Sequence, residues 1–148
     1  MSESEILRKI AVIFVTDVVG FSTLMAQNEE LTLRSFRSCK EILDNLFEEH
    51  SGRIFNTAGD SVLAEFPSAV SAVICAVEFQ KLIKARNASV NKEAQMQFRI
   101  GLNMGDVIIE GTNLYGDGVN VAARLEALSQ AGGVCLSKSI HDFVSQKV

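Results

Sequence analysis

Apolar residues recur along this chain with two different periods, which predicts a mixture of strands and helices. Residues 9–17, KIAVIFVTD, form a near-continuous apolar run with β-branched side chains and predict a buried strand. Residues 28–50 instead repeat apolar side chains every three or four positions, the spacing of one helix face. The side chains of that face are Leu33, Phe36, Cys39, Leu43 and Leu46.

The next segments predict a hairpin followed by a second helix. GRIFN at 52–56 and SVLAEF at 61–66 have strand character and flank the turn sequence TAGD. After Pro67, residues 68–87 predict a helix with Ser68 as its cap. We expect the buried stripe of this helix to consist of Val70, Val73, Ile74, Val77 and Leu82.

Strict alternation marks residues 96–104, MQFRIGLNM, and predicts another strand. The residues on its apolar face are Phe98, Ile100, Leu102 and Met104. A turn at Gly105, followed by VIIE, predicts a second hairpin. A helix over 118–130, a short strand over 134–136 and a helix from Lys138 complete the pattern.

The resulting element order, β-α-β-β-α-β-β-α-β-α, mixes hairpins with helical crossovers. This order favours an α+β fold: a mainly antiparallel, ferredoxin-like sheet with helices packed on one face. No repeat or linker-like run divides the sequence, so we expect one domain over residues 1–148.

Composition narrows the classes of function. The chain is 47% hydrophobic and 22% charged with a net charge of -4, which fits a globular protein and disfavours broad nucleic-acid binding. No apolar run is long enough for a membrane span, and the N-terminus lacks signal-peptide character, so a cytoplasmic location is expected. Three widely spaced cysteines disfavour a disulfide framework or a zinc site.

Two aspartates are candidates for metal binding. Asp17 ends the first predicted strand, and Asp60 lies in the turn between the next two strands. If these strands are neighbours, the two carboxylates repel each other unless a cation lies between them. Mg²⁺ is suitable because it is bound by one or two carboxylates together with substrate phosphates. Two solvated turn aspartates are the alternative.

Other segments have the residue types that bind phosphate. Gly20 permits close approach of the backbone, and a helix beginning near Ser22 would present free N–H groups to an anion. Asn120 and Arg124 lie four residues apart and therefore share one helix face. An ordinary strand-to-helix turn and a solvated helix face are the respective alternatives. P-loop and nucleophile-elbow motifs are absent from the sequence.

Four segments, taken in order, resemble the class III nucleotide cyclase catalytic domain. They are FVTDVVGFSTLM, GRIFNTAGDSVLAEFPSAVSAV, FRIGLNMGDVI and LYGDGVNVAARLEAL, within residues 11–137. The resemblance implies conversion of ATP to 3′,5′-cyclic AMP and pyrophosphate, with two Mg²⁺ or Mn²⁺ ions as cofactors. It also implies a head-to-tail homodimer with composite active sites.

The resemblance assigns roles residue by residue. Asp17 and Asp60 match the metal-binding aspartates, and Val18 matches the position whose carbonyl joins the metal shell. The positions that match the loop holding the nucleotide phosphates are Gly20, Phe21 and Ser22. In the family, the residues matched by Asn120 and Arg124 come from the opposite chain, where they orient the ribose and stabilise the transition state.

Two positions depart from the family pattern. Asn56 and Asn113 stand where many ATP-using members have lysine and aspartate or threonine, and where guanylate cyclases have glutamate and cysteine. The family's C-terminal hairpin is also missing, so we expect a truncated domain from a longer protein. The alternatives are a guanylate cyclase or a catalytically degenerate, dimerising nucleotide-binding module. A diguanylate cyclase is disfavoured because no GGDEF-like segment occurs.

Overall fold

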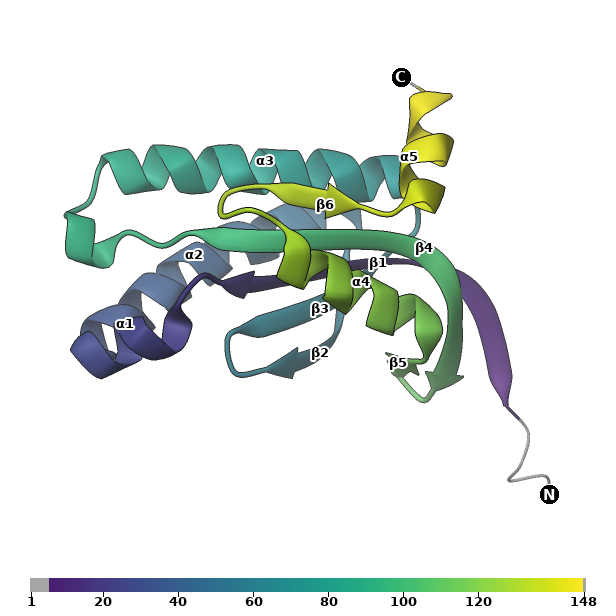
Figure 1. Ribbon diagram of the computed structural model, residues 1–148, viewed down its shortest axis with the longest axis horizontal. Helices are drawn as coiled ribbons and strands as arrows, with labels where there is room; N and C mark the ends of the chain where they lie inside the picture. The colour runs from purple at the N-terminus through teal and green to yellow at the C-terminus, as the bar shows by residue number, and fades with distance from the viewer. Residues whose placement is uncertain (1–5, 148) are drawn as a thin grey trace.

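The computed structural model describes residues 6–147 and shows one sheet with helices on both of its faces (Figure 1). The strands are β1 Leu7–Val18, β2 Arg53–Ala58, β3 Ser61–Phe66, β4 Phe98–Glu110, β5 Asn113–Tyr115 and β6 Val134–Leu136. The helices are α1 Phe21–Gln27, α2 Glu29–His50, α3 Ala69–Ala88, α4 Asp117–Leu128 and α5 Lys138–Ser145, with a short 3-10 turn at Lys92–Ala94.

The sheet has the order β2-β3-β1-β4-β5, and β6 pairs with β4. All neighbouring strands are antiparallel except β4 and β6. The central pair is long, because β1 stays in register with β4 from Leu7 opposite Ile109 to Val18 opposite Phe98. The predicted α+β class with a mainly antiparallel sheet is therefore confirmed.

Two apolar layers lie on opposite faces of this sheet. The larger layer contains Phe14, Phe98 and Ile100 from the strands, packed against α2, α3 and Ile140 of α5. The smaller layer lies under α4 and around β5; its members are Ala11, Ile13, Val15, Phe55, Val107, Leu114, Val119 and Ala122. The expectation that all helices cover one face was therefore wrong for α4, which lies in front of the sheet in Figure 1.

The predicted stripe of α3 was also wrong. Ile74, Val77 and Leu82 are 50%, 42% and 42% exposed, and Val70 and Val73 are only half-buried. The buried face instead contains Ala69, Ala72, Cys75, Ala76, Phe79 and Ile83. Because α3 carries apolar residues around most of its circumference, its sequence period does not specify which side packs. Small side chains, which permit a close approach to the sheet, lie on the buried side.

The predicted turn at Gly105 does not exist, because β4 continues through it to Glu110. The hairpin turn lies at residues 111–112 instead, where Gly111 has a φ of +61° that favours glycine. A Cβ on Gly118 of α4 would lie 2.6 Å from the carbonyl oxygen of Asp106 and 3.1 Å from the carbonyl carbon of Gly105. Gly105 therefore lies at a close helix–sheet contact.

Among residues 6–147, no helix is both long and apolar enough to cross a membrane.

The backbone of α4 lies very close to β4 at Gly101. A Cβ there would lie 2.3 Å from the backbone nitrogen of Glu126 and 2.4 Å from the carbonyl oxygen of Ala122. These are backbone atoms, so no side-chain rotation can relieve the overlap. The position of α4 on β4 therefore requires glycine at this point of the strand.

We expect Gly101→Ala to lower the free energy of unfolding by about 3 kcal/mol, because α4 must move away from β4. Urea denaturation followed by circular dichroism measures this loss. Ser38→Ala, on the exposed side of α2, is the control and should change stability by less than about 0.5 kcal/mol. A Gly101→Ala protein as stable as wild type would contradict the backbone contact.

Candidate active site

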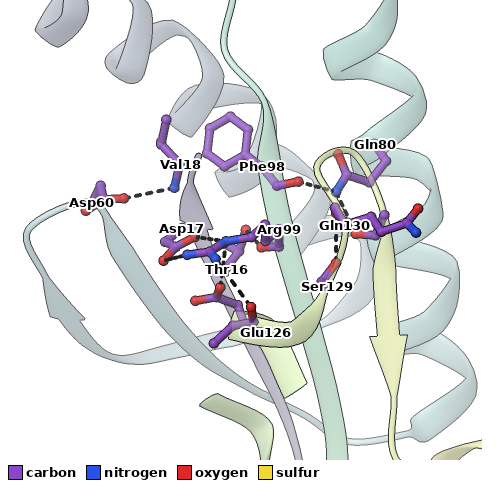
Figure 2. A network of polar contacts seen from close by, with 12 residues as sticks. Thr16, Asp17, Val18, Asp60, Gln80, Phe98, Arg99, Glu126, Ser129 and Gln130 are labelled. Carbon is purple, nitrogen blue, oxygen red and sulfur yellow. Dashed lines mark hydrogen bonds and ion pairs between the residues drawn. The ribbon is translucent and has the colours of Figure 1, made fainter. Parts of the chain in front are cut away.

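The two candidate metal-binding aspartates meet where β1 ends. Thr16 of β1 pairs with Val62 of β3, so the end of β1 lies beside the turn that precedes β3. Asp60, in that turn, accepts a hydrogen bond from the backbone nitrogen of Val18 at 2.8 Å. Figure 2 shows its carboxylate directed toward the residue that follows Asp17. The sequence-predicted neighbours are therefore brought together, from two different elements.

Arg99 of β4 is the immediate partner of Asp17. Its Nη2 lies 3.0 Å from Asp17 Oδ2, and its Nε donates to Asp17 Oδ1 at 3.2 Å. The two residues face each other in the β1–β4 register, which fixes this pairing. Hydrogen bonding to Asp17 raises the pKa of the Arg99 guanidinium above its ordinary value. Asp17 is thus neutralised by a fixed cation of its own chain.

Glu126 of α4 completes the network from the other side. Its side chain is only 7% exposed, and its Oε2 lies 3.2 Å from Arg99 Nε. Among the described residues this buried oxygen has no hydrogen-bond partner, because the single hydrogen on Arg99 Nε is donated to Asp17. Burial, followed by the nearby charge of Asp17, raises the pKa of Glu126 to about 8 despite the attraction of Arg99. We expect Arg99 to be the weaker influence because it is already engaged with Asp17.

Gly20 is the N-cap of α1, and Phe21 and Ser22 are the first two residues of this helix. Gly20 adopts a left-handed conformation with φ of +65° and lies immediately before the helix. The first N–H bonded back within α1 is that of Leu24, to the Gly20 carbonyl at 3.0 Å. The three earlier N–H groups lack intrahelical partners, as at any helix start. The Phe21 ring packs on Phe36, with the centroids 5.8 Å apart, and the residue is half-buried.

Asn120 and Arg124 lie on the exposed side of α4, opposite the buried Val119, Ala122 and Glu126. Among the described residues, neither forms a hydrogen bond or an ion pair with Asp17 or Asp60 through its side chain. The structure therefore brings together Asp17, Val18 and Asp60 within the chain, whereas Asn120 and Arg124 face outward.

Asn56 and Asn113, the two departures from the family pattern, lie on β2 and β5. Asn56 is exposed and Asn113 is half-buried. Each side-chain carbonyl accepts the backbone N–H of the next residue, Thr57 at 2.9 Å and Leu114 at 2.8 Å. The Asn113 amide nitrogen also donates to the hydroxyl of Tyr115 at 3.0 Å.

Sequence reasoning missed Arg99 and Glu126. A signal was present for Arg99, since it is a charged residue between Phe98 and Ile100 in a strongly apolar strand. Such a residue is expected to have a partner when the strand is covered on both faces. Glu126 had no local signal, because only the packing of α4 on β4 reveals its burial.

The oxygen-rich donor set fits a hard divalent cation bound together with phosphate. Asp17 and Glu126 contact Arg99, and the Asp60 carboxylate lies at the Val18 nitrogen, one residue beyond Asp17. Within residues 6–147, no group of three or more acidic, histidine or cysteine side chains is arranged to hold a metal by itself. Mg²⁺ needs only one or two carboxylates when nucleotide phosphates supply further ligands.

Comparison with known proteins identifies the family of this chain. The model of the family described as "Adenylate and Guanylate cyclase catalytic domain" matches residues 3–148. The chain belongs to this cyclase family. It is 43% identical over 145 residues to "Putative adenylate cyclase 3" of Rhizobium meliloti strain 1021, which covers 97% of this chain and 25% of that protein. The cyclase domain thus spans about a quarter of the length of this curated relative.

Solved cyclase structures share the fold. An adenylate/guanylate cyclase/hydrolase from Silicibacter pomeroyi aligns with a TM-score of 0.87 and 36% identity, over 97% of this chain and 84% of that one. The adenylyl cyclase CyaB from P. aeruginosa aligns with a TM-score of 0.82 and 25% identity, over 96% and 83% of the two chains. The guanylyl cyclase domain of the RhoGC fusion protein from Blastocladiella emersonii gives 0.83 and 25%, over 96% and 89%.

The raised pKa of Glu126 predicts a pH-dependent contribution to stability. Between about pH 4.5 and 8 the folded chain holds a proton that the unfolded chain releases, so this contribution falls as the pH rises through that window. Glu126→Gln removes this titration. Between pH 5 and 9, its free energy of unfolding should therefore rise by about 2 kcal/mol relative to that of the wild type. Urea unfolding in metal-free buffer measures the difference, with the exposed Glu93→Gln as the control. If the free energy of unfolding changed with pH in the same way for wild type and Glu126→Gln, the raised pKa of Glu126 would be contradicted.

Proposed function

We propose that this cyclase domain converts ATP to 3′,5′-cyclic AMP and pyrophosphate, as half of a head-to-tail homodimer with two Mg²⁺ or Mn²⁺ ions per site. The observation that supports this most directly is the convergence of Asp17 and Asp60 at the end of β1 in a chain of the cyclase family. The charges of the two carboxylates repel each other, and within the chain Arg99 compensates Asp17 while the Val18 N–H donates to Asp60.

Each residue has a proposed task. When bound, the divalent cations would lower the pKa of the ribose 3′-OH and neutralise phosphate charge. Asp17, Asp60 and the Val18 carbonyl would hold these cations at the end of β1. The backbone at Gly20–Ser22 would bind the phosphates. The 3′ oxygen then attacks the α-phosphorus in line, and pyrophosphate leaves.

The remaining groups come from a second copy of the chain. Asn120 and Arg124 are exposed on α4, on the side away from the Glu126–Arg99–Asp17 network of their own chain. In the proposed dimer, Asn120 of one copy orients the ribose bound to the other. Arg124 meets the negative charge that develops on the phosphoryl oxygens, for which a fixed guanidinium is well suited.

ATP is proposed as substrate because relatives named as adenylate or adenylyl cyclases align over nearly all of the chain. A guanylyl cyclase aligns equally well in structure, so GTP is the alternative substrate. A cytoplasmic location and additional domains in the whole protein also belong to this proposal.

A second candidate function is nucleotide binding without turnover, in a degenerate dimerising module. The observation in its favour is the bidentate contact of Arg99 with Asp17, which neutralises one of the two metal-binding carboxylates. Under this alternative, Arg99 remains on Asp17 when nucleotide binds.

Asp17→Asn should lower turnover of ATP by about 100-fold or more, because the amide carries no charge for the cation. It should also abolish the rise in melting temperature that Mn²⁺ produces together with a non-cyclisable ATP analogue. The matched control is Asp44→Asn on the exposed side of α2, which should retain both properties. Wild-type protein that binds nucleotide and forms no cyclic product would favour the second candidate.

The composite site predicts complementation between two inactive variants. Asp17→Asn and Arg124→Ala each damage a different half of the site, so a mixed dimer regains one intact site. After subunit exchange of equal amounts, about a quarter of all sites should be intact, by the symmetry of a two-fold dimer. Cyclic nucleotide production by the mixture, compared with each variant alone, measures this recovery. Exchange without any recovery would contradict the head-to-tail arrangement.

A further inference from the structure

Asn56 and Asn113 belong to strands at opposite ends of the sheet path, yet these strands approach each other. Arg53 of β2 donates to the carbonyl oxygen of Thr112, next to β5, at 2.7 Å. Phe55 and Leu114, the chain neighbours of the two asparagines, belong to one apolar layer. The sheet therefore curls until β2 and β5 lie side by side, as Figure 1 shows at its lower edge.

The two asparagines are held in the same local arrangement. In each, the side-chain oxygen accepts the N–H of the next residue, at 2.9 Å for Asn56 and 2.8 Å for Asn113. Rotating either amide by 180° would place its NH₂ group against that N–H, donor against donor. The amide orientation is therefore fixed by the backbone, and the NH₂ group is the end left for a ligand.

Tyr115 strengthens this bias at Asn113. The Asn113 NH₂ group donates to the Tyr115 hydroxyl oxygen at 3.0 Å, so that hydroxyl has its own proton left to donate. Tyr115 is 46% exposed, which leaves it accessible to a ligand. Asn56 and Asn113 therefore each have an N–H hydrogen left for a ligand, and Tyr115 has its O–H hydrogen.

Neither purine matches a set of donors completely. On its Watson–Crick edge adenine has the N6 amino donor beside the N1 acceptor, whereas guanine has the O6 acceptor beside the N1–H donor. Two amide donors satisfy N1 of adenine or O6 of guanine. In either case they leave a donor of the base facing a donor of the protein.

We propose that Asn56 and Asn113 read the base through N–H donors alone, so that the cyclase uses ATP and GTP with similar efficiency. This inference rests on the proposed function, in which these two positions contact the base. The inference is that the site has relaxed specificity for the two substrates. Each base forms one hydrogen bond with the two amides, and its own donor group is left without an acceptor.

The first test is the ratio of kcat/KM for ATP to that for GTP in the wild-type dimer. We expect a ratio within about tenfold of one, because each base has one matched and one unmatched contact. The free energy that these two contacts contribute is therefore similar for ATP and GTP. A preference larger than about tenfold for either nucleotide would overturn the inference.

The second test uses Asn56→Asp and Asn113→Asp. Each retains the oxygen that accepts the next backbone N–H, but its outward atom becomes an acceptor. One acceptor beside one donor matches adenine in one order and guanine in the other. The two single variants should therefore shift the ATP-to-GTP ratio in opposite directions, each by about tenfold. Shifts in the same direction, or no shift in either variant, would refute donor-only reading.

Asn91→Asp is the matched control, because this exposed asparagine lies outside the site and should leave the ratio unchanged.

Different outcomes would contradict the inference and the proposed function. Turnover of only one nucleotide overturns the inference and leaves the cyclase activity standing, whereas no turnover of either overturns the activity. In that second case, calorimetric dissociation constants for α,β-methylene analogues of ATP and GTP give the same ratio. The tenfold limit and the opposite shifts then decide the inference from binding alone.

Discussion

The close contact of α4 with β4 determines where the polar groups of the site lie. At Gly101 and Gly118 a Cβ would fall 2.3 Å and 2.6 Å from backbone atoms of the opposing element. With the helix this close to the strand, Glu126 is buried beside Arg99, and Asn120 and Arg124 remain on the outer side. One helix therefore completes the internal network of its own chain and exposes groups suited to a second chain.

The charge balance at the end of β1 follows from that placement. The Arg99 guanidinium contacts the carboxylates of Asp17 and Glu126, and the charge of Asp60 acts on it from nearby. Two features reduce the excess negative charge when no metal is bound. The raised pKa of Glu126 favours its neutral form, and Arg99 donates two hydrogen bonds to the Asp17 carboxylate. A divalent cation would make the protonation of Glu126 unnecessary, and it would compete with Arg99 for Asp17. Metal affinity, the charge of Glu126 and the position of Arg99 are therefore expected to be coupled.

The sequence predicted local features well and long-range packing poorly. The strands around Phe14 and Ile100 were predicted correctly, because an apolar run and an alternating pattern are visible within short segments. Asp60 lies at the end of β1 because β1 pairs with β3, the condition on which the expected nearness of the two aspartates depended. The buried side of α3 and the role of Gly105 depend on what packs against them, which no local period contains. The Arg99–Glu126 contact joins residues 27 positions apart on different elements, so it could be found only after α4 was placed. The roles of Asn120 and Arg124 remain predictions, because their proposed partners lie on another copy of the chain.

The curl of the sheet links base reading to the same architecture. Strands β2 and β5 can meet only if the sheet bends around its smaller apolar layer, where Phe55 and Leu114 pack under α4 with Val119. The elements that carry Asn56 and Asn113 are thereby attached to the helix that carries Asn120 and Arg124. One copy of the chain would then present the base-reading and ribose-orienting groups as a single rigid surface, and the other would supply the carboxylates. Base choice in such a dimer depends on the polarity of two side-chain amides, and this polarity is imposed by the backbone N–H groups of Thr57 and Leu114.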